Sequence, residues 1–359
     1  MIHTHLKDML KKVVDMHDLT YEEMCSCMES ILAGGASDVL VAALLTALRM
    51  KGESIDELNA MLDVMLKHAI RVRVNGYVID TAGTGGDNSG TFNISTVAAL
   101  IASASGVKVA KHGNRAVSSI SGSADVLEYL GYNLDADKAK VEECIEQIGI
   151  GFIFAPRFHP AMSRVAHVRR EMGIRTAFNI VGPVCNPAMP NAQVVGVYST
   201  AVMDKIAGML KHAGREEFMV VHAIDGMDEL SNTCMNRVLW YKSDANEVNL
   251  EVDPNSLGLS TAKKEDLVVR DREEVAEIFL NVLNGNARRE VMDAVLLNAA
   301  AALIVGKKAS SFKEGIEVAR ACVMDGRAYK RLKELIARCG DIERFEEVEG
   351  KMVKKLKYK

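Results

Sequence analysis

The stretch GTGGDNSGTFNIST, residues 83–96, combines residue types suited to holding a phosphorylated ligand. Its glycines leave a bare backbone that can bring several N–H groups against phosphate oxygens, and a following helix adds its positive N-terminus. Ser95 and Thr96 would add hydroxyls at that helix start, whereas the charge of Asp87 suits sugar hydroxyls or a nearby metal. The alternative is a tight turn with a capping serine. The spacing matches neither of the two common nucleotide-binding glycine motifs.

A second polar loop, residues 111–123, carries two cations and several hydroxyls before an expected helix. Its polar side chains are Lys111, His112, Asn114, Arg115, Ser118, Ser119, Ser121 and Ser123. Cations and hydroxyls beside a helix N-terminus favour anion binding, although a solvated surface loop has the same composition. Two such loops on one edge of a sheet make an anionic ligand the preferred interpretation.

The segment DGMDE supplies the acids Asp225, Asp228 and Glu229 directly after an expected strand. Adjacent carboxylates repel one another unless a cation joins them. Mg²⁺ takes one or two protein carboxylates, while waters and substrate phosphates complete its shell. Solvated acidic residues are the alternative, but opposite two phosphate-suited loops the pattern favours a magnesium site.

The segment around Pro160 offers a cation for a carboxylate ligand. We expect His159 to end a strand and Pro160 to start a helix that runs to Met172. Arg169 and Arg170 lie nearly three turns into that helix, and a guanidinium there could hold a carboxylate through two hydrogen bonds. Spacing alone leaves both arginines open, and an ordinary surface arginine is the alternative.

These loops are positioned by alternating strands and helices. We expect strands at 77–82, 107–113, 151–156, 193–199 and 218–223, and helices at 95–106, 123–131 and 201–214. This order predicts a parallel α/β sheet, with ligands at the carboxyl ends of its strands. Residues 237–241 predict an edge strand, and we expect about the last ninety residues to be mainly helical.

The first seventy residues predict four helices. Thr20 with Glu23, and Ser54 with Glu57, have the spacing of capping boxes at two helix starts. The helix expected over residues 38–50, DVLVAALLTALRM, is apolar almost all round. Such a helix must be buried in a core or against a second subunit.

The composition of the 359-residue chain suggests an ordinary globular protein of two or three domains, with 48% hydrophobic and 26% charged residues. A net charge of −4 argues against a nucleic-acid partner. Seven scattered cysteines indicate reduced thiols and a cytoplasmic location. The first ten residues show no signal segment. The longest apolar run, AVLLNAAAALIVG, is short and interrupted by Asn298, so we expect no membrane association.

Taken in order, the motifs resemble the anthranilate phosphoribosyltransferase family over nearly the whole chain. They are LRMKGES, GTGGD, NIST, KHGNR, SGSADVLE, HPAM, GIRTAFNIVGPVCNPA and DGMDE. The resemblance implies an α/β fold of the nucleoside phosphorylase/phosphoribosyltransferase type, with a mainly parallel central sheet. It implies a small helical domain of residues 1–70 plus 160–190, and a larger α/β domain of residues 71–159 plus 191–359. It also implies an active site in the interdomain cleft and a homodimer formed through the helical domain.

The family joins anthranilate to phosphoribosyl pyrophosphate (PRPP) in tryptophan biosynthesis, and the resemblance implies roles for matching positions. Donor contacts are implied for Gly83, Gly86, Asp87, Thr91, Asn93, Ser95, Thr96, Lys111, Asn114, Ser119 and Ser123. Anthranilate contacts are implied for Gly83, His112, Asn114, His159, Arg169 and Pro183. Binding of Mg²⁺, with two ions per active site, is implied for Ser95, Asp228 and Glu229. The nucleophile is a neutral aromatic amine, so we expect no dedicated catalytic acid or base.

Two features depart from the family pattern. Ile120 stands where several members have lysine, and SNTCMNRVLWY after Leu230 replaces a more usual turn. A pyrimidine nucleoside phosphorylase is one alternative, but it would carry Lys-His-Ser-Thr-Gly-Gly where this chain has DTAGTGGD. A non-catalytic sensor of phosphorylated nucleotides is another, against which the presence of Asp228, Glu229 and Arg169 argues.

Overall fold

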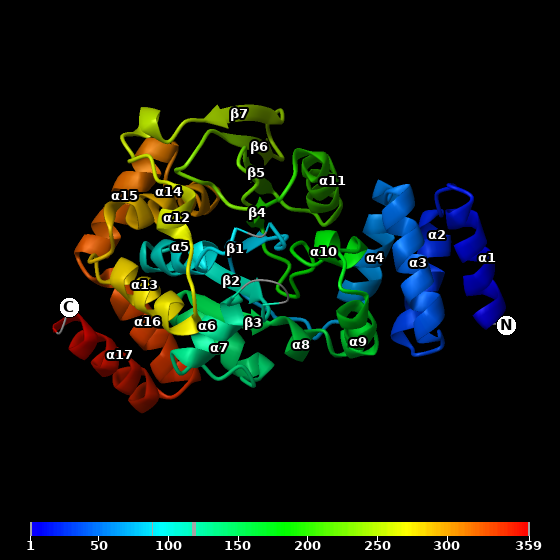
Figure 1. The fold of residues 1–359 in the computed structure, drawn as a ribbon, viewed down its shortest axis with the longest axis horizontal. Helices are drawn as coiled ribbons and strands as arrows, with labels where there is room; N and C mark the ends of the chain where they lie inside the picture. Colours follow the sequence, from blue (N-terminus) through cyan, green and yellow to red (C-terminus); the bar gives the residue numbers. More distant parts are fainter. Residues whose placement is uncertain (1, 88, 117–119, 358–359) are drawn as a thin grey trace.

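The computed structural model describes residues 2–87, 89–116 and 120–357, with side chains between residues 5 and 352 of these ranges. Ser118 and Ser119, which we expected in the second loop, lie outside the described residues. Figure 1 shows a helical part, α1 to α4, at one end of the molecule and a larger part built on a β-sheet at the other. The expected combination of a small helical part and a larger α/β part is confirmed.

A seven-stranded sheet in the order β3-β2-β1-β4-β5-β6-β7 forms the centre of the larger part. Its strands are β1 (Val78–Gly83), β2 (Lys108–Gly113), β3 (Ile150–Phe154), β4 (Ala192–Gly196), β5 (Glu217–Ala223), β6 (Asn236–Lys242) and β7 (Val248–Val252). The strands β1 to β5 pair in parallel, and β6 and β7 pair antiparallel. The sheet is therefore mainly parallel, as predicted.

The prediction that residues 237–241 form an edge strand is wrong. The strand β6 covers these residues, but it lies between β5 and β7, so β7 forms the edge. The sequence of β7, VNLEV, is exposed or half-buried at its first four positions. Without a buried apolar face, this strand gave no sequence signal.

Two helices, α5 (Ile94–Ala104) and α14 (Arg289–Val305), pack against each other and against β1. The helix α14 is buried without interruption from Val291 to Val305. The other helices of this part are α6 (Ser123–Tyr129), α7 (Lys138–Ile148), α11 (Met203–His212), α12 (Lys264–Leu267), α13 (Arg272–Leu283), α15 (Phe312–Met324), α16 (Arg327–Cys339) and α17 (Ile342–Lys357), with 3₁₀ turns at Thr200–Val202 and Asn255–Leu257. No helix within the described ranges has the length and apolarity to cross a membrane.

The helical part contains α1 (Ile2–Val14), α2 (Tyr21–Leu32), α3 (Asp38–Lys51) and α4 (Ile55–Lys67), as predicted. Both capping boxes are present, with Thr20 and Ser54 as the N-caps of α2 and α4. One face of α3 is buried, but Val39 and Met50 are 77% and 78% exposed. A single copy of the chain therefore leaves part of this apolar helix uncovered.

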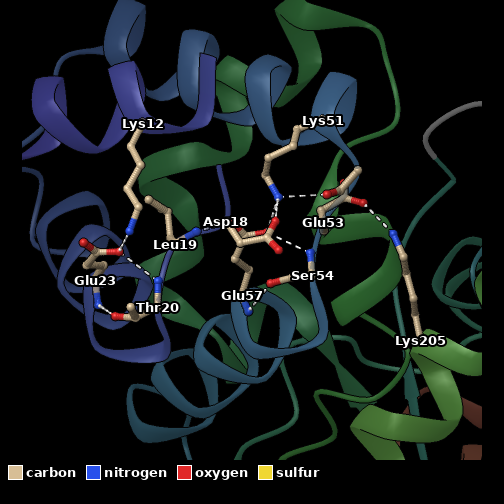
Figure 2. Close-up of polar contacts among 11 residues, drawn as sticks. Lys12, Asp18, Leu19, Thr20, Glu23, Lys51, Glu53, Ser54, Glu57 and Lys205 are labelled. Carbon is tan, nitrogen blue, oxygen red and sulfur yellow. Dashed lines mark hydrogen bonds and ion pairs between the residues drawn. The ribbon is translucent and has the colours of Figure 1, made fainter. Parts of the chain in front are cut away.

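A polar cluster ties α3, α4 and the α1–α2 connection together (Figure 2). Glu57 is fully buried, and its carboxylate lies 2.9 Å from the Lys51 ammonium. Lys51 also pairs with Asp18 at 2.5 Å, and the Leu19 N–H donates to Glu57 Oε1 at 2.9 Å. This cluster occupies the LRMKGES segment and gives that motif a structural role.

The segment between β3 and β4 leaves the sheet and packs on the helical part (Figure 1). It contains α8 (Ala155–Phe158), a 3₁₀ turn (Pro160–Met162), α9 (Ser163–Met172) and α10 (Ala177–Val181). The helix α9 contacts α2 and α3, and α10 contacts α3 and α4.

His159 does not end a strand, contrary to the prediction. The strand β3 stops at Phe154, and His159 follows the short helix α8. Pro156 explains the difference, because it cannot donate a strand hydrogen bond and its fixed φ suits the first turn of a helix. The predicted helix over residues 160–172 is also divided, into a 3₁₀ turn and α9.

Candidate active site

The first loop, between β1 and α5, takes the sharp turns that its glycines allow. Gly85, Gly86 and Gly90 have φ angles of 67°, 72° and 67°, in the left-handed region that favours glycine. Asn93 is the N-cap residue of α5, so Ser95 and Thr96 lie in the first turn of that helix. The loop thus leads from a buried strand to a helix N-terminus, where anionic oxygens are stabilised.

Asp228 and Glu229 reach this loop from the end of β5. The Gly85 N–H donates to Asp228 Oδ2 at 2.6 Å, and the Ser95 N–H donates to Glu229 Oε1 at 3.1 Å. The Asp228 N–H in turn donates to Asp87 Oδ2 at 3.4 Å. The structure therefore brings the predicted acids and Ser95 together.

Glycine is needed at two strand ends for this close approach. A Cβ atom on Gly83 would lie 2.4 Å from Asp228 Oδ2. A Cβ atom on Gly196 would lie 1.6 Å from the Asp228 carbonyl oxygen. Any larger residue at either position would displace the acidic segment, so Gly83 borders the carboxylates by steric necessity.

The electrostatics of these acids fit a bound cation. Burial, together with the charge of Asp87, raises the pKa of Asp228 to about 7. Burial and the charge of Asp228 raise the pKa of Glu229 well above its usual range. Glu229 Oε2 is buried without a hydrogen-bond partner among the described residues. A cation would offset the repulsion and coordinate this oxygen atom.

The donor set matches Mg²⁺, which uses one or two protein carboxylates and takes its other oxygen ligands from water and substrate phosphates. No group of three or more His, Cys, Asp or Glu side chains in the described part of the chain could hold a metal ion. Asp225 is directed elsewhere, because it accepts a hydrogen bond from Thr233 at 2.5 Å and lies 3.9 Å from Lys264. A metal ion here would therefore need substrate or water oxygens.

The second loop is tied to the first through Asn93, whose Nδ2 donates to the Ser121 carbonyl at 3.0 Å. Ser123 begins α6, and its hydroxyl donates to the Asn114 carbonyl at 3.3 Å. Asn93, Asn114 and Ser123 therefore belong to one connected pair of loops, as the donor assignment requires.

The two cations of the second loop already have partners. Arg115 forms a two-point ion pair with Glu128 at 2.6 and 2.7 Å and also contacts Asp125 at 3.2 Å. These acids lie on α6 and withdraw Arg115 from the anion site that we expected in this loop. The sequence could not reveal this pairing, because it depends on how α6 folds back over the loop.

Lys111 is buried at 3% exposure and donates to the Thr81 carbonyl at 2.6 Å. Burial lowers its pKa, against the opposing charges of Asp80 and Glu229. Lys111 is thus a cation held beneath the carboxylate loop.

The hydroxyl groups of the first loop differ in their bonding. Thr91 hydrogen-bonds with Ser89 at 3.1 Å. Thr84 and Thr96 have buried Oγ1 atoms without a hydrogen-bond partner in the described part of the structure. The Thr96 hydroxyl therefore has unused hydrogen-bonding capacity at the start of α5, and its donor role stays a prediction.

A pair of histidines lies beside the end of β2. The rings of His112 and His159 are 5.2 Å apart, and His159 Nε2 lies 3.0 Å from the Cys185 carbonyl oxygen. Burial lowers the pKa of His159 to about 4 and that of His112 well below its usual range. Both rings are therefore neutral at pH 7. Each keeps one buried nitrogen without a described partner, His112 Nε2 and His159 Nδ1.

Pro183 is joined to these histidines through a buried polar network. Gln193 donates to the Pro183 carbonyl at 3.1 Å and to Asp80 at 3.2 Å. Asp80 accepts from the His112 N–H at 3.2 Å, and Arg215 donates to Gln193 at 2.7 Å. The sequence analysis missed this network. A charged Asp80 inside the apolar strand YVIDTA was its one visible signal.

The structure distinguishes Arg169 from Arg170. Arg169 lies with its guanidinium carbon 5.2 Å from the Phe178 ring centre, and burial lowers its pKa. No described carboxylate forms an ion pair with it. Arg170 is exposed. Of these two arginines, Arg169 is therefore the partly buried one, and no described carboxylate pairs with it.

Arg175 was also missed. Its Nε atom lies 2.7 Å from where a Cβ atom on Gly86 would be. Its guanidinium carbon lies 3.9 Å from the Tyr198 ring centre. Arg175 therefore packs the connector between α9 and α10 against the first loop. It belongs to the GIRT motif, but spacing gave it no distinct role.

Family comparisons cover both parts of the chain. Residues 75–329 match the α/β domain of the glycosyl transferase family, and residues 7–69 match its helical bundle domain. The chain is 45% identical over 332 residues to the anthranilate phosphoribosyltransferase of Thermoanaerobacter sp., covering 92% of this chain and 98% of the relative. It is 44% identical over 347 residues to that of Acetivibrio thermocellus, covering 96% and 100%.

Solved structures agree with these relatives. The anthranilate phosphoribosyltransferase of Thermus thermophilus superimposes with a TM-score of 0.85 at 41% identity, covering 92% of this chain and 98% of the other. The enzyme of Saccharomyces cerevisiae in complex with PRPP and Mg gives 0.85 at 26% identity, and in complex with 4-fluoroanthranilate 0.84 at 25% identity. Each yeast comparison covers 93% of this chain and 97% of the other.

Proposed function

The chain belongs to the anthranilate phosphoribosyltransferase family, and we propose that the loops and carboxylates described above form its active site. The enzyme transfers the phosphoribosyl group of PRPP to the amine of anthranilate. The products are N-(5-phosphoribosyl)anthranilate and pyrophosphate, and the reaction belongs to tryptophan biosynthesis. The observation that best supports this site is the pair of carboxylates at the first loop, in which Glu229 Oε2 is buried and has no hydrogen-bond partner among the described residues.

Asp228, Glu229 and Ser95 hold Mg²⁺, with two ions per active site. Their support is the contact of Asp228 with the first loop, the contact of Glu229 with the first turn of α5, and the raised pKa values of both carboxyl groups, for which burial is the main cause. When bound, Mg²⁺ supplies positive charge that stabilises the departing pyrophosphate. The yeast relative was solved with PRPP and Mg, which is consistent with this assignment.

The two loops bind the donor. Backbone N–H groups of the first loop and the α5 N-terminus face the diphosphate, because their dipoles favour negative charge. Asp87 accepts hydrogen bonds from ribose hydroxyls. The other donor contacts come from Gly83, Gly86, Thr91, Asn93, Ser95, Thr96, Lys111, Asn114, Ser119 and Ser123.

Anthranilate binds on the side of the connector. Arg169 holds its carboxylate, since a guanidinium forms a planar pair of hydrogen bonds with a carboxylate. The neutral rings of His112 and His159 line the pocket with Pro183, while Gly83 and Asn114 border the donor. The chain needs no general base, because the amine is already neutral, so positioning it against C1 of the ribose does much of the work.

The remaining assignments concern organisation. Residues 1–70 plus 160–190 form the helical domain and the rest forms the α/β domain, which the contacts of α9 and α10 with α2, α3 and α4 support. Seven unpaired cysteines support a cytoplasmic enzyme.

A homodimer forms through residues 1–60, which buries the exposed apolar side chains of α3 and the end of α1. Sedimentation velocity should give a dimer at micromolar concentration, and a monomer there would reject this assignment.

The activity is tested by following the loss of anthranilate fluorescence. We expect the signal to fall only when PRPP and Mg²⁺ are both present, and EDTA to stop it. A phosphate-dependent release of ribose 1-phosphate from a pyrimidine nucleoside, without loss of anthranilate, would instead support the phosphorylase alternative.

A further inference from the structure

Asn298 is a polar residue in the middle of the most apolar segment of the chain. It lies on α14, which is buried from Val291 to Val305, and is itself 6% exposed. A polar side chain at such a position is costly unless its hydrogen bonds are made. The partners of Asn298 therefore indicate why the residue is there.

Asn298 hydrogen-bonds to both backbone polar groups of Leu230, a residue on a loop distant in sequence. Its Oδ1 accepts from the Leu230 N–H at 3.0 Å, and its Nδ2 donates to the Leu230 carbonyl at 2.7 Å. A further bond from Nδ2 to the Ala294 carbonyl, at 2.9 Å, fixes the side chain on its own helix. Leu230 directly follows the two acids. Asn298 therefore holds the peptide group that joins Glu229 to Leu230.

The opposite side of the acidic segment is fixed by the two glycines. Gly83 and Gly196 leave no room for a Cβ atom beside Asp228. Asn298 also lines a small cavity together with Ser95, Asp228 and Glu229. The carboxylate pair is thus confined between the ends of β1 and β4 and a side chain anchored in the buried helix α14.

We propose that Asn298 is a positioning residue that orients Asp228 and Glu229 for Mg²⁺, an inference that rests on the proposed role of these acids as metal ligands. Adjacent carboxylates repel each other in the absence of a cation, so a weakly held loop would turn one of them away. Two hydrogen bonds from a rigid helix prevent that rotation. Groups that orient metal ligands typically change metal affinity by about 10–100-fold when removed.

The test is the variant Asn298→Leu, which has similar size but cannot hold Leu230. We expect the Mg²⁺ concentration for half-maximal activity to rise about tenfold, with saturating Mg²⁺ restoring most of kcat and the anthranilate KM unchanged. A titration with Mn²⁺ in the presence of PRPP, followed by electron paramagnetic resonance, should show the same loss of affinity without turnover.

The matched control is Asn232→Leu. Asn232 is 1% exposed and lies on the same segment, but it donates to the carbonyls of Ser260 and Glu290 at 3.1 and 2.9 Å rather than to Leu230. Its loss should lower the melting temperature and leave Mn²⁺ affinity unchanged. If Asn298→Leu does not fold, Asn298→Ser keeps a small polar group for the Ala294 carbonyl and should show the metal defect.

Unchanged Mn²⁺ affinity in a folded Asn298 variant, or an equal defect in Asn232→Leu, would overturn the proposal. Measuring Asp228→Asn with Glu229→Gln in parallel separates the two levels of the argument. If that double variant also keeps its Mn²⁺ affinity, the metal assignment fails. If it loses affinity while the Asn298 variants do not, only the positioning role fails.

Discussion

Two groups of charged residues in this protein differ in whether their charges are compensated within the chain. At the start of α4, Glu57 and Lys51 lie 2.9 Å apart, and Asp18 completes the group (Figure 2). At the proposed active site, Asp228 and Glu229 accept hydrogen bonds from backbone N–H groups, with a further acid, Asp87, beside Asp228. The Lys111 ammonium acts on Glu229 but donates its hydrogen bond to the Thr81 carbonyl. The first arrangement is complete within the chain, whereas the second requires a partner.

The pKa directions express the same contrast. Burial alone would lower the pKa of Lys51, but its hydrogen bonds with Asp18 and Glu57 outweigh burial and raise it. Among the proposed site residues, burial raises the pKa of Asp228 to about 7 and lowers that of Arg169. Both shifts disfavour the charged form. Asp228 and Glu229 are therefore acids that need a cation, and Arg169 is a cation that needs an anion, which are properties of a binding site rather than of a stable core.

The largest effect should come from removing the uncompensated acids. Asp228→Asn with Glu229→Gln should lower activity by about two to three orders of magnitude, the cost of losing a main electrostatic stabiliser. Steady-state rates over a range of Mg²⁺ concentrations measure this. Because the double variant removes repulsion, its melting temperature should not fall. Wild-type rates at ordinary Mg²⁺ would contradict the metal assignment.

The complementary variant breaks the compensated pair. Glu57→Gln leaves the Lys51 ammonium buried beside only Asp18, and losing one partner of a buried pair costs about 3 kcal/mol or more. Urea denaturation should show this loss in the free energy of unfolding.

The control for this pair is kcat, which should stay close to wild type, because Glu57 lies on α4 and is not one of the proposed active-site residues. The double variant Lys51→Met with Glu57→Leu should recover much of the stability. If Glu57→Gln abolished activity while remaining folded, the distinction between the two regions would be wrong.

The sequence predicted the features that follow local rules. Capping boxes at Thr20 and Ser54, glycines with positive φ in the first loop, and strands with buried apolar residues all have short-range signals. The approach of the first loop to DGMDE also followed, because loops at the carboxyl ends of parallel strands share one edge.

The remaining features depend on contacts between distant segments. No local pattern indicated that Glu128 would pair with Arg115, or that Asn298 would hold Leu230 across 68 positions. The same holds for β7, which lacks a buried face. His159 is a different case, because Pro156 was visible and its helix-starting tendency was overlooked.

A smaller effect is expected from the uncompensated cation. Arg169→Ala should raise the anthranilate KM, or lower kcat/KM for anthranilate, by about ten- to a hundredfold, since one charge-assisted contact contributes roughly 1.5–3 kcal/mol. The PRPP KM should change little, because the two loops and Mg²⁺ hold the donor. Steady-state kinetics with each substrate varied in turn gives both values.

Arg170→Ala is the matched control for Arg169. Arg170 is its exposed neighbour on α9, and replacing it should change the kinetic constants little. A defect for anthranilate in Arg170→Ala alone would reassign the carboxylate contact. A raised PRPP KM in Arg169→Ala would mean that the anthranilate site is assigned to the wrong residues.

The smallest expected effect is on the pH dependence of the free energy of unfolding, and it concerns the neutral histidines of the proposed anthranilate site. Burial lowers the pKa of His159 to about 4 in the folded chain, whereas an unfolded histidine titrates near 6.5. Between these values the unfolded state binds a proton that the folded state excludes. The stabilising difference is therefore complete above pH 6.5 and is lost as pH falls toward 4, by about 1 kcal/mol per pH unit.

His159→Asn removes this titration while an amide can still bond to the Cys185 carbonyl. Urea denaturation between pH 7.5 and 5 should therefore show a shallower loss of stability for the variant than for the wild type. His112 titrates in the same direction, because burial also lowers its pKa, so the slope should be reduced rather than abolished. Equal slopes in the two proteins would mean that His159 accepts a proton in the folded state, and the description of the acceptor side as neutral would then be wrong.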